Sequence, residues 1–149
     1  MQFTNFQDIL DFAIQREEEA IQGYGKMREI AKTPGIEKLL AELQDEERKH
    51  KDLLLNVDLD KIESGTQDVT DLKISDYLVE EPLSAEMTFQ DLLIFAAKKE
   101  QKAVELYTKM GQKVGSEELK KLFNFLIQQE KTHKLKLEEE YEKHVMEWD

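Results

Sequence analysis

Four glutamates and two histidines recur at a fixed spacing in this 149-residue chain, and together they have the chemistry of a metal site. An offset of 83 residues maps each candidate ligand in the first half onto one in the second half. The resulting pairs are Glu17 with Glu100, Glu47 with Glu130, and His50 with His133. Carboxylate and imidazole form a hard-to-borderline ligand set, which suits iron or manganese and tolerates zinc.

The same offset preserves the sequence around these residues, and the two halves align without a gap. The segment FQDILDFA at 6–13 returns as FQDLLIFA at 89–96, and Tyr24 returns as Tyr107. A Glu-x-x-His motif occurs in both halves, at 47–50 and at 130–133. One such motif carries little weight, because any charged helix can contain it by chance. Two motifs at one offset predict two copies of one unit that share a site.

Each candidate ligand lies in the middle of an apolar helical face. Between Phe6 and Met27 apolar residues alternate in steps of four and three, and Glu17 falls within this series. The periodicity therefore selects Glu17 over its neighbours Glu18 and Glu19. The other three faces contain Glu47 with His50, Glu100, and Glu130 with His133. We expect the four helices to begin at Asn5, at Thr33, at Thr88 and just after Ser116.

Four such faces predict an all-α protein in which two helical hairpins form a four-helix bundle. The first hairpin covers about 5–55 and the second about 88–145, within a single domain over 1–149. The connection at about 56–87 is too long for a tight turn in a compact bundle. It is long enough for a crossover that runs the length of the bundle, with a short helix at about 74–79.

Four carboxylates that face one another in a core need compensating charge. Burial of an uncompensated carboxylate costs several kcal/mol, and two divalent cations would supply about four positive charges. Glu and His at i and i+3 lie on neighbouring turns. Both can contact one metal while the second carboxylate oxygen reaches another metal about 3.5–4 Å away. The alternative is a chance or structural polar network without metal. Tyr24 and Tyr107 are either aromatic core residues or hydrogen-bond donors to a ligating carboxylate.

The composition argues against several other functions. A formal net charge of −12 disfavours nucleic acid or an anionic membrane surface as the main partner. A sequence without cysteine has no disulfide, no thiolate nucleophile and no cysteine-ligated zinc or iron–sulfur centre. No run approaches 18 apolar residues, so we expect no membrane-spanning helix. The first residues lack the features of a signal peptide, and we expect a cytoplasmic protein.

These motifs resemble those of the ferritin-like di-iron carboxylate superfamily, and within it the rubrerythrin family, over essentially the whole chain. Glu17 with Tyr24 is similar to the Glu-x6-Tyr of the first helix in this family, and Glu100 with Tyr107 to its third-helix counterpart. The two Glu-x-x-His motifs are similar to those of the second and fourth helices. The resemblance implies a ferritin-like bundle with two iron ions, for which manganese or zinc can substitute. The implied bridging ligands are Glu47 and Glu130, the implied terminal ligands are Glu17 and Glu100, and each metal has one histidine.

Two features distinguish the chain from typical rubrerythrins. Full-length rubrerythrins carry a rubredoxin domain with a four-cysteine iron site, which this cysteine-free sequence lacks. Electrons would therefore come from a separate donor, such as a rubredoxin-like protein. Typical rubrerythrins also have an additional glutamate one turn after the third-helix ligand, where this chain has Ala103. Ala103 corresponds to Ala20 in the repeat, which predicts a symmetric site with six ligands.

Three functions are compatible with such a site. The first is a di-iron oxidoreductase of oxidative-stress defence that reduces hydrogen peroxide or dioxygen. The second is ferritin-like iron oxidation, binding or storage. The third is a non-enzymatic bundle whose polar core sets the helix register. We expect the first function, in a homodimer or larger homo-oligomer. Nothing in the sequence indicates the enlarged pocket that hydroxylation of an organic substrate would need.

Overall fold

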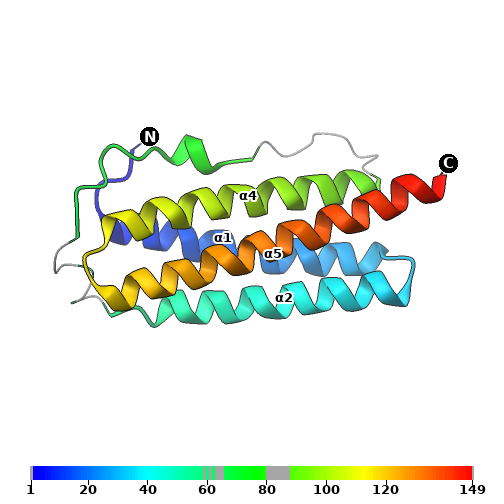
Figure 1. Cartoon of the computed structure of the whole chain (residues 1–149), viewed down its shortest axis with the longest axis horizontal. Coiled ribbons are helices and arrows are strands. Elements are labelled where there is room, and N and C mark those ends of the chain that lie inside the picture. The colour runs from blue at the N-terminus through cyan, green and yellow to red at the C-terminus, as the bar shows by residue number, and fades with distance from the viewer. Residues whose placement is uncertain (1, 59, 61, 63–65, 80–87, 149) are drawn as a thin grey trace.

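Long α-helices that pack side by side make up most of the protein (Figure 1). The structure is a computed structural model that describes residues 2–58, 60, 62, 66–79 and 88–148, with side chains up to residue 143. Within these ranges the elements are α1 (Phe6–Ile30), α2 (Pro34–Leu55), the 3₁₀ helix η1 (Ile74–Tyr77), α4 (Phe89–Lys113) and α5 (Glu117–Trp148). The predicted all-α four-helix bundle is confirmed. Among the described residues, no helix is both long enough and apolar enough to cross a membrane.

The helices form two antiparallel hairpins, α1 with α2 and α4 with α5, and helix–helix contacts are most extensive within these pairs. In Figure 1, α2 ends at the left of the bundle and α4 begins at the right. The connection between them therefore returns the chain to the end where α2 began, as its length predicted. The expected short helix in this connection is η1, which packs against α4. Residues 80–87 of the predicted crossover lie outside the described residues.

The helix starts follow the expected capping residues. The side chain of Asn5 accepts a hydrogen bond from the backbone N–H of Asp8 at 2.9 Å, and Thr33 caps α2 in the same way. At the start of α4, Thr88 and Asp91 form a reciprocal capping box. These side chains satisfy amide groups that have no partner within the helix. The capping residues thus fix where three of the helices begin.

Two separate clusters of buried apolar side chains fill the two ends of the bundle. The first includes Leu10, Leu54, Leu106 and Leu126, and the second includes Leu40, Leu43, Leu93 and Leu137. Along α1, Ala13 belongs to the first cluster, Met27 belongs to the second, and Glu17 lies between them. On each of the other three helices, the glutamate and histidine ligands also lie between residues of the first cluster and residues of the second. A buried polar layer therefore crosses the middle of the bundle.

The helices of the first hairpin approach closely at Gly25. A Cβ atom at this position would lie 2.8 Å from Nε2 of Gln44 on α2. This Nε2 donates to the carbonyl oxygen of Ile21 at 2.8 Å, and Arg28 donates to Oε1 of the same amide, also at 2.8 Å. Glycine at position 25 therefore makes room for a side chain that joins α2 to α1.

Candidate metal centre

The structure brings all six candidate ligands together in the polar layer. They are Glu17 on α1, Glu47 and His50 on α2, Glu100 on α4, and Glu130 and His133 on α5. Each of them is at most 1% exposed to solvent. Ionisable side chains are seldom buried to this degree unless they are paired or bind metal ions. We call these six side chains the ligand cage.

The cage contains two overlapping groups of potential ligand atoms. The first group is Glu17, Glu47, His50 and Glu130, and the second is Glu47, Glu100, Glu130 and His133. Within each group the ligand atoms lie within 4.8 Å of one another. Oε1 of Glu47 is 3.3 Å from Nδ1 of His50 and 2.9 Å from Nδ1 of His133. Because Glu47 and Glu130 belong to both groups, they lie where two neighbouring metal ions would be bridged.

The atoms that face the interior of the cage lack hydrogen-bond partners of good geometry in the described part of the chain. They are Oε2 of Glu17, Oε1 of Glu47, Oε2 of Glu100, Oε1 of Glu130, and Nδ1 of His50 and His133. Buried polar atoms without a partner are rare in folded proteins. Here they include one atom from each of the six side chains, all of types that bind iron, manganese or zinc. The residues present therefore fit a pair of metal ions.

The ionisable groups of the cage strongly shift one another's pKa values. Burial, and after it the neighbouring Glu47, raises the pKa of Glu17 well above its usual range. Burial and the nearby Glu100 would raise the pKa of Glu47, but its close contacts with His133 and His50 outweigh them and lower this pKa to about 2. Burial would lower the pKa of His133, yet interactions with Glu100 and Glu47 raise it to about 11. His133 thus holds a proton that a metal ion would replace.

Both tyrosines of the repeat bond the glutamate of the other half. The hydroxyl of Tyr24 donates to Oε1 of Glu100 at 2.8 Å, and the hydroxyl of Tyr107 donates to Oε1 of Glu17. Burial and the nearby carboxylates raise the pKa of both hydroxyls well above the usual range, so they remain donors. Each tyrosine also belongs to one of the two apolar clusters. Both tyrosines are therefore aromatic core residues and, at the same time, hydrogen-bond donors to a candidate ligand.

His133 is held by a residue outside the cage. Its Nε2 contacts Oε2 of Glu46 on α2, whereas its Nδ1 faces the carboxylates. With the proton on Nε2, the lone pair of Nδ1 is directed to the cage. Sequence reasoning missed Glu46, because it lies one residue before Glu47 and off the apolar face. Nε2 of His50 has no hydrogen-bond partner among the described residues. In the second half of the repeat, Gln129 is the residue that corresponds to Glu46.

Arg16 is the second residue that sequence reasoning missed. Although it is an arginine, it is only 7% exposed, and its guanidinium contacts all four glutamates of the cage. Nη1 is 2.7 Å from Oε1 of Glu17 and 3.4 Å from Oε2 of Glu47. Nη2 is 3.4 Å from Oε1 of Glu100 and 3.2 Å from Oε2 of Glu130. Its spacing in the sequence could have indicated this burial, because Arg16 lies three positions after Ala13, a residue of the apolar face.

A groove of about 470 Å³ between α1 and α4 reaches the cage. Its lining includes Tyr24 and Glu100, and the small residues Ala20 and Gly23. A Cβ atom at Gly23 would meet no atom within 4 Å, so the missing side chain leaves space. In the repeat the corresponding residue is Leu106, which is fully buried. The sequence had not indicated this space.

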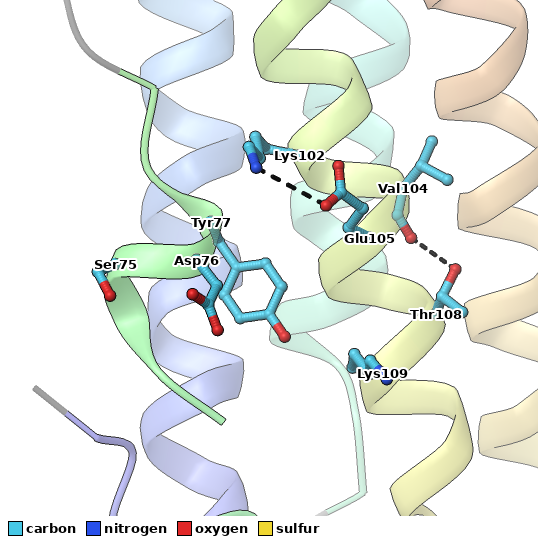
Figure 2. A pocket seen from close by; sticks show the side chains of 8 residues that line it. All are labelled: Ser75, Asp76, Tyr77, Lys102, Val104, Glu105, Thr108 and Lys109. Atoms are coloured by element: carbon cyan, nitrogen blue, oxygen red, sulfur yellow. Dashed lines mark hydrogen bonds and ion pairs between the residues drawn. The ribbon is translucent and has the colours of Figure 1, made fainter. Parts of the chain in front are cut away.

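Another cavity, of about 550 Å³, lies between η1 and α4 (Figure 2). Its lining includes Tyr77, Lys102, Glu105 and Thr108. Nζ of Lys102 is 3.7 Å from Oε1 of Glu105, and Thr108 donates to the carbonyl oxygen of Val104 at 2.7 Å. These polar groups are thus paired with one another, and the lining contains no member of the ligand cage. We therefore assign the chemistry to the cage and not to this cavity.

The fold is that of ferritin-like proteins, and a layer of four glutamates and two histidines that could hold metal ions is buried in the middle of the bundle. A model of the rubrerythrin family matches residues 8–141. The chain therefore belongs to the rubrerythrin family. No curated protein matches it.

Two solved structures are similar to this chain over almost its whole length. One is a hypothetical protein from Pyrococcus furiosus, with 25% identity, a TM-score of 0.75, and coverage of 97% of this chain and 92% of that one. The other, from Thermotoga maritima, is described as a putative ferritin-like diiron-carboxylate protein. It shares 25% identity at a TM-score of 0.75, with coverage of 97% of this chain and 99% of that one. Both similarities extend over the helices that carry the ligand cage.

Proposed function

We propose that the protein is a rubrerythrin-type oxidoreductase that reduces hydrogen peroxide or dioxygen at a pair of iron ions. The observation that carries this proposal is the division of the cage into two groups that share Glu47 and Glu130. Such an arrangement suits two adjacent metals, each with its own histidine and its own terminal glutamate. In the proposed site Glu17 and His50 hold one ion, and Glu100 and His133 hold the other.

The chemistry that bound iron supplies is one electron per ferrous ion, and two electrons with two protons convert one hydrogen peroxide into two water molecules. The protein's own side chains position the ligating carboxylates and exclude water from the site. Tyr24 and Tyr107 fix one oxygen of Glu100 and of Glu17, which leaves the other oxygen of each to face the cage. The apolar clusters on both sides keep bulk water away from these groups.

The groove between α1 and α4 is the proposed entry for a small oxidant. It includes Glu100, a proposed ligand of one metal, in its lining. Polar residues such as Glu19 and Lys99 also line it, so hydrogen peroxide can approach through a hydrated opening. An organic substrate is a poorer match, because Tyr24 and Glu100 are almost fully buried and leave little surface for it to contact.

Reduction of the oxidised site requires electrons from outside the sequence described here, because it contains no cysteine to bind an iron–sulfur or rubredoxin-type centre. We propose a separate one-electron donor, such as a rubredoxin-like protein. We further propose a homodimer or larger homo-oligomer that functions in the cytoplasm.

Rapid mixing of anaerobic, Fe(II)-loaded protein with hydrogen peroxide tests this function. We expect iron oxidation faster than in buffer alone, and repeated turnover when reduced rubredoxin is added. The matched control is Glu47→Gln, which removes one shared carboxylate and should abolish the fast phase. Peroxide oxidation no faster than the buffer control would contradict the proposal. A large hollow assembly of many subunits that holds many iron ions per chain would instead support iron storage.

A further inference from the structure

Arg16 contacts each glutamate of the ligand cage through the oxygen opposite the one that faces the cage interior. We propose that Arg16 is a positioning residue of the metal centre, which holds these outer oxygens in place and keeps a permanent positive charge beside the metal ions. This inference rests on the metal-binding part of the proposed function and not on the reaction that follows. It assigns a role to a residue that belongs to neither group of candidate ligands.

Each terminal nitrogen of the guanidinium contacts the glutamates of one helical hairpin. Nη1 contacts Oε1 of Glu17 on α1 and Oε2 of Glu47 on α2. Nη2 contacts Oε1 of Glu100 on α4 and Oε2 of Glu130 on α5. The carboxylate atoms that lack a hydrogen-bond partner among the described residues are the other oxygen of each of these side chains. The planar guanidinium therefore leaves one oxygen of every glutamate free to bind metal.

The two glutamates shared by both groups of ligand atoms depend most on this contact. The tyrosines of the repeat bond the outer oxygens of the two terminal glutamates, and neither of them donates to Glu47 or Glu130. Arg16 donates to Oε2 of both shared glutamates. The other oxygen of Glu47 lies 3.3 Å from Nδ1 of His50 and 2.9 Å from Nδ1 of His133. By holding Oε2, Arg16 keeps this inner oxygen directed between the two histidines.

The charge of Arg16 should also affect the iron ions themselves. Arginine remains protonated in proteins, so this charge is present at every physiological pH. Two divalent ions balance the four carboxylates, and the guanidinium adds one further positive charge to the site. Oxidation of an iron ion adds another, and repulsion between like charges is strong in a buried, low-dielectric layer. Arg16 should therefore favour Fe(II) over Fe(III).

The internal repeat supplies a matched control for this charge. Lys99 corresponds to Arg16 in the second half, and its side chain lies outside the cage with 28% exposure. Its Nζ is 3.7 Å from Oε2 of Glu19 and 5.3 Å from the centre of the Phe95 ring. Substitution of either residue by methionine removes one positive charge from the protein, but only Arg16→Met removes it from the cage.

Redox titration of the iron-loaded proteins, followed by visible absorption, tests the effect of the charge. At a fixed potential, we expect the ratio of Fe(II) to Fe(III) in Arg16→Met to be about tenfold lower than in the wild type, or lower still. A tenfold change corresponds to a midpoint potential about 59 mV more negative for a one-electron step. Lys99→Met should stay close to the wild type, because solvent and salt screen its charge.

A residue that only stabilised the fold would change the melting temperature without changing the midpoint potential. Equal midpoints for Arg16→Met and Lys99→Met would therefore overturn the inference while leaving the metal site intact. Wild-type protein that binds no iron would instead contradict the proposed function, and with it this inference.

Visible absorption of the Co²⁺-loaded proteins tests the positioning of the carboxylates. The cobalt bands depend on the geometry of the ligands. Arg16→Met should alter their position or intensity, because Glu47 and Glu130 lose the donor to their outer oxygens. Lys99→Met should reproduce the wild-type spectrum. Identical spectra for Arg16→Met and the wild type would overturn the inference.

Nuclear magnetic resonance of the Zn²⁺-loaded wild type provides a test that does not depend on whether Arg16→Met folds. The sequence contains three arginines, Arg16, Arg28 and Arg48, so substitution of the last two by lysine assigns the guanidinium N–H signals of the first. These signals should exchange with solvent about tenfold or more slowly than those of Arg48, whose side chain is 52% exposed. Equal exchange rates for Arg16 and Arg48 in the loaded protein would overturn the inference.

Discussion

The hydroxyl of Tyr24 on α1 lies 2.8 Å from Oε1 of Glu100 on α4, so one half of the repeat positions a candidate ligand of the other half. Tyr107 on α4 contacts Glu17 on α1 in the reciprocal manner. Both hydrogen bonds cross between the hairpins, where helix contacts are less extensive than within each hairpin. The two halves therefore depend on each other for the geometry of a single site.

Removal of one such hydroxyl should weaken metal binding. We expect Tyr24→Phe to lower the affinity for Zn²⁺ about tenfold or more, because an unrestrained Glu100 no longer keeps its free oxygen directed to the cage. The loaded protein should also lose about 1.5–3 kcal/mol of unfolding free energy, the usual contribution of a hydrogen bond to a charged group. Tyr141→Phe is the control, since Tyr141 packs at the edge of the second apolar cluster away from the cage. Equal affinities for the two variants would contradict this role for Tyr24.

Glu46 should matter for one metal more than for the other. Glu46→Gln removes the carboxylate that orients His133, and loss of such a partner commonly lowers metal affinity about 10–100-fold. Stepwise titration with Co²⁺, followed by visible absorption, should show one weakened and one nearly unchanged binding step. Gln129→Ala, at the corresponding position of the repeat, should leave both steps unchanged, because the side chain of Gln129 makes no hydrogen bond among the described residues. Two equally weakened steps would show that Glu46 does not act through His133.

The groove between α1 and α4 can be tested at Gly23. Gly23→Ala should stabilise the protein by up to about 1 kcal/mol, because alanine favours the helix and its Cβ meets open space. Gly25→Ala should be less stable than Gly23→Ala, because its Cβ would approach Nε2 of Gln44 to 2.8 Å. Thermal and denaturant unfolding measure this difference.

A larger side chain at the same position separates stability from access. Gly23→Leu should fill part of the groove and slow the oxidation of bound Fe(II) by peroxide without changing the metal content. Oxidation at the wild-type rate in Gly23→Leu would mean that the oxidant enters by another route.

Metal binding should release protons. His133, whose pKa is about 11, is protonated at neutral pH without metal but must lose its Nδ1 proton to become a ligand, and burial raises the pKa of Glu17 in the same direction. The affinity for Zn²⁺ should therefore rise with pH over the whole range in which Zn²⁺ stays in solution, because that range lies below the pKa of His133 of about 11. A pH-indicator dye in weakly buffered solution should report acidification on addition of Zn²⁺, and His133→Ala should release fewer protons. Metal uptake without acidification would contradict the protonation states described here.

Much of the fold could be predicted because it depends on local periodicity. The steps of three and four residues located four helix faces and separated Glu17 from Glu18 and Glu19, and capping residues marked where helices begin. The 83-residue repeat then indicated which polar residues share a layer. These signals lie within single helices or in the comparison of the two halves.

The remaining features depend on side chains that cross between helices. Glu46 reaches His133, 87 positions away in sequence, and the direction of Arg16 depends on the carboxylates around it. The groove exists because Gly23 lacks a side chain opposite α4, and its open space follows from packing. Helical periodicity contains no information on these three-dimensional relationships.

The most direct test of the central claim is an anaerobic titration of the metal-free protein with Fe(II), with bound iron determined per chain. The six side chains of the cage and its two groups of ligand atoms predict saturation at about two iron ions per chain. The Glu130→Ala variant, which lacks a carboxylate shared by both groups, should bind fewer. Saturation at one ion or none in the wild type would contradict the assignment of a two-metal site.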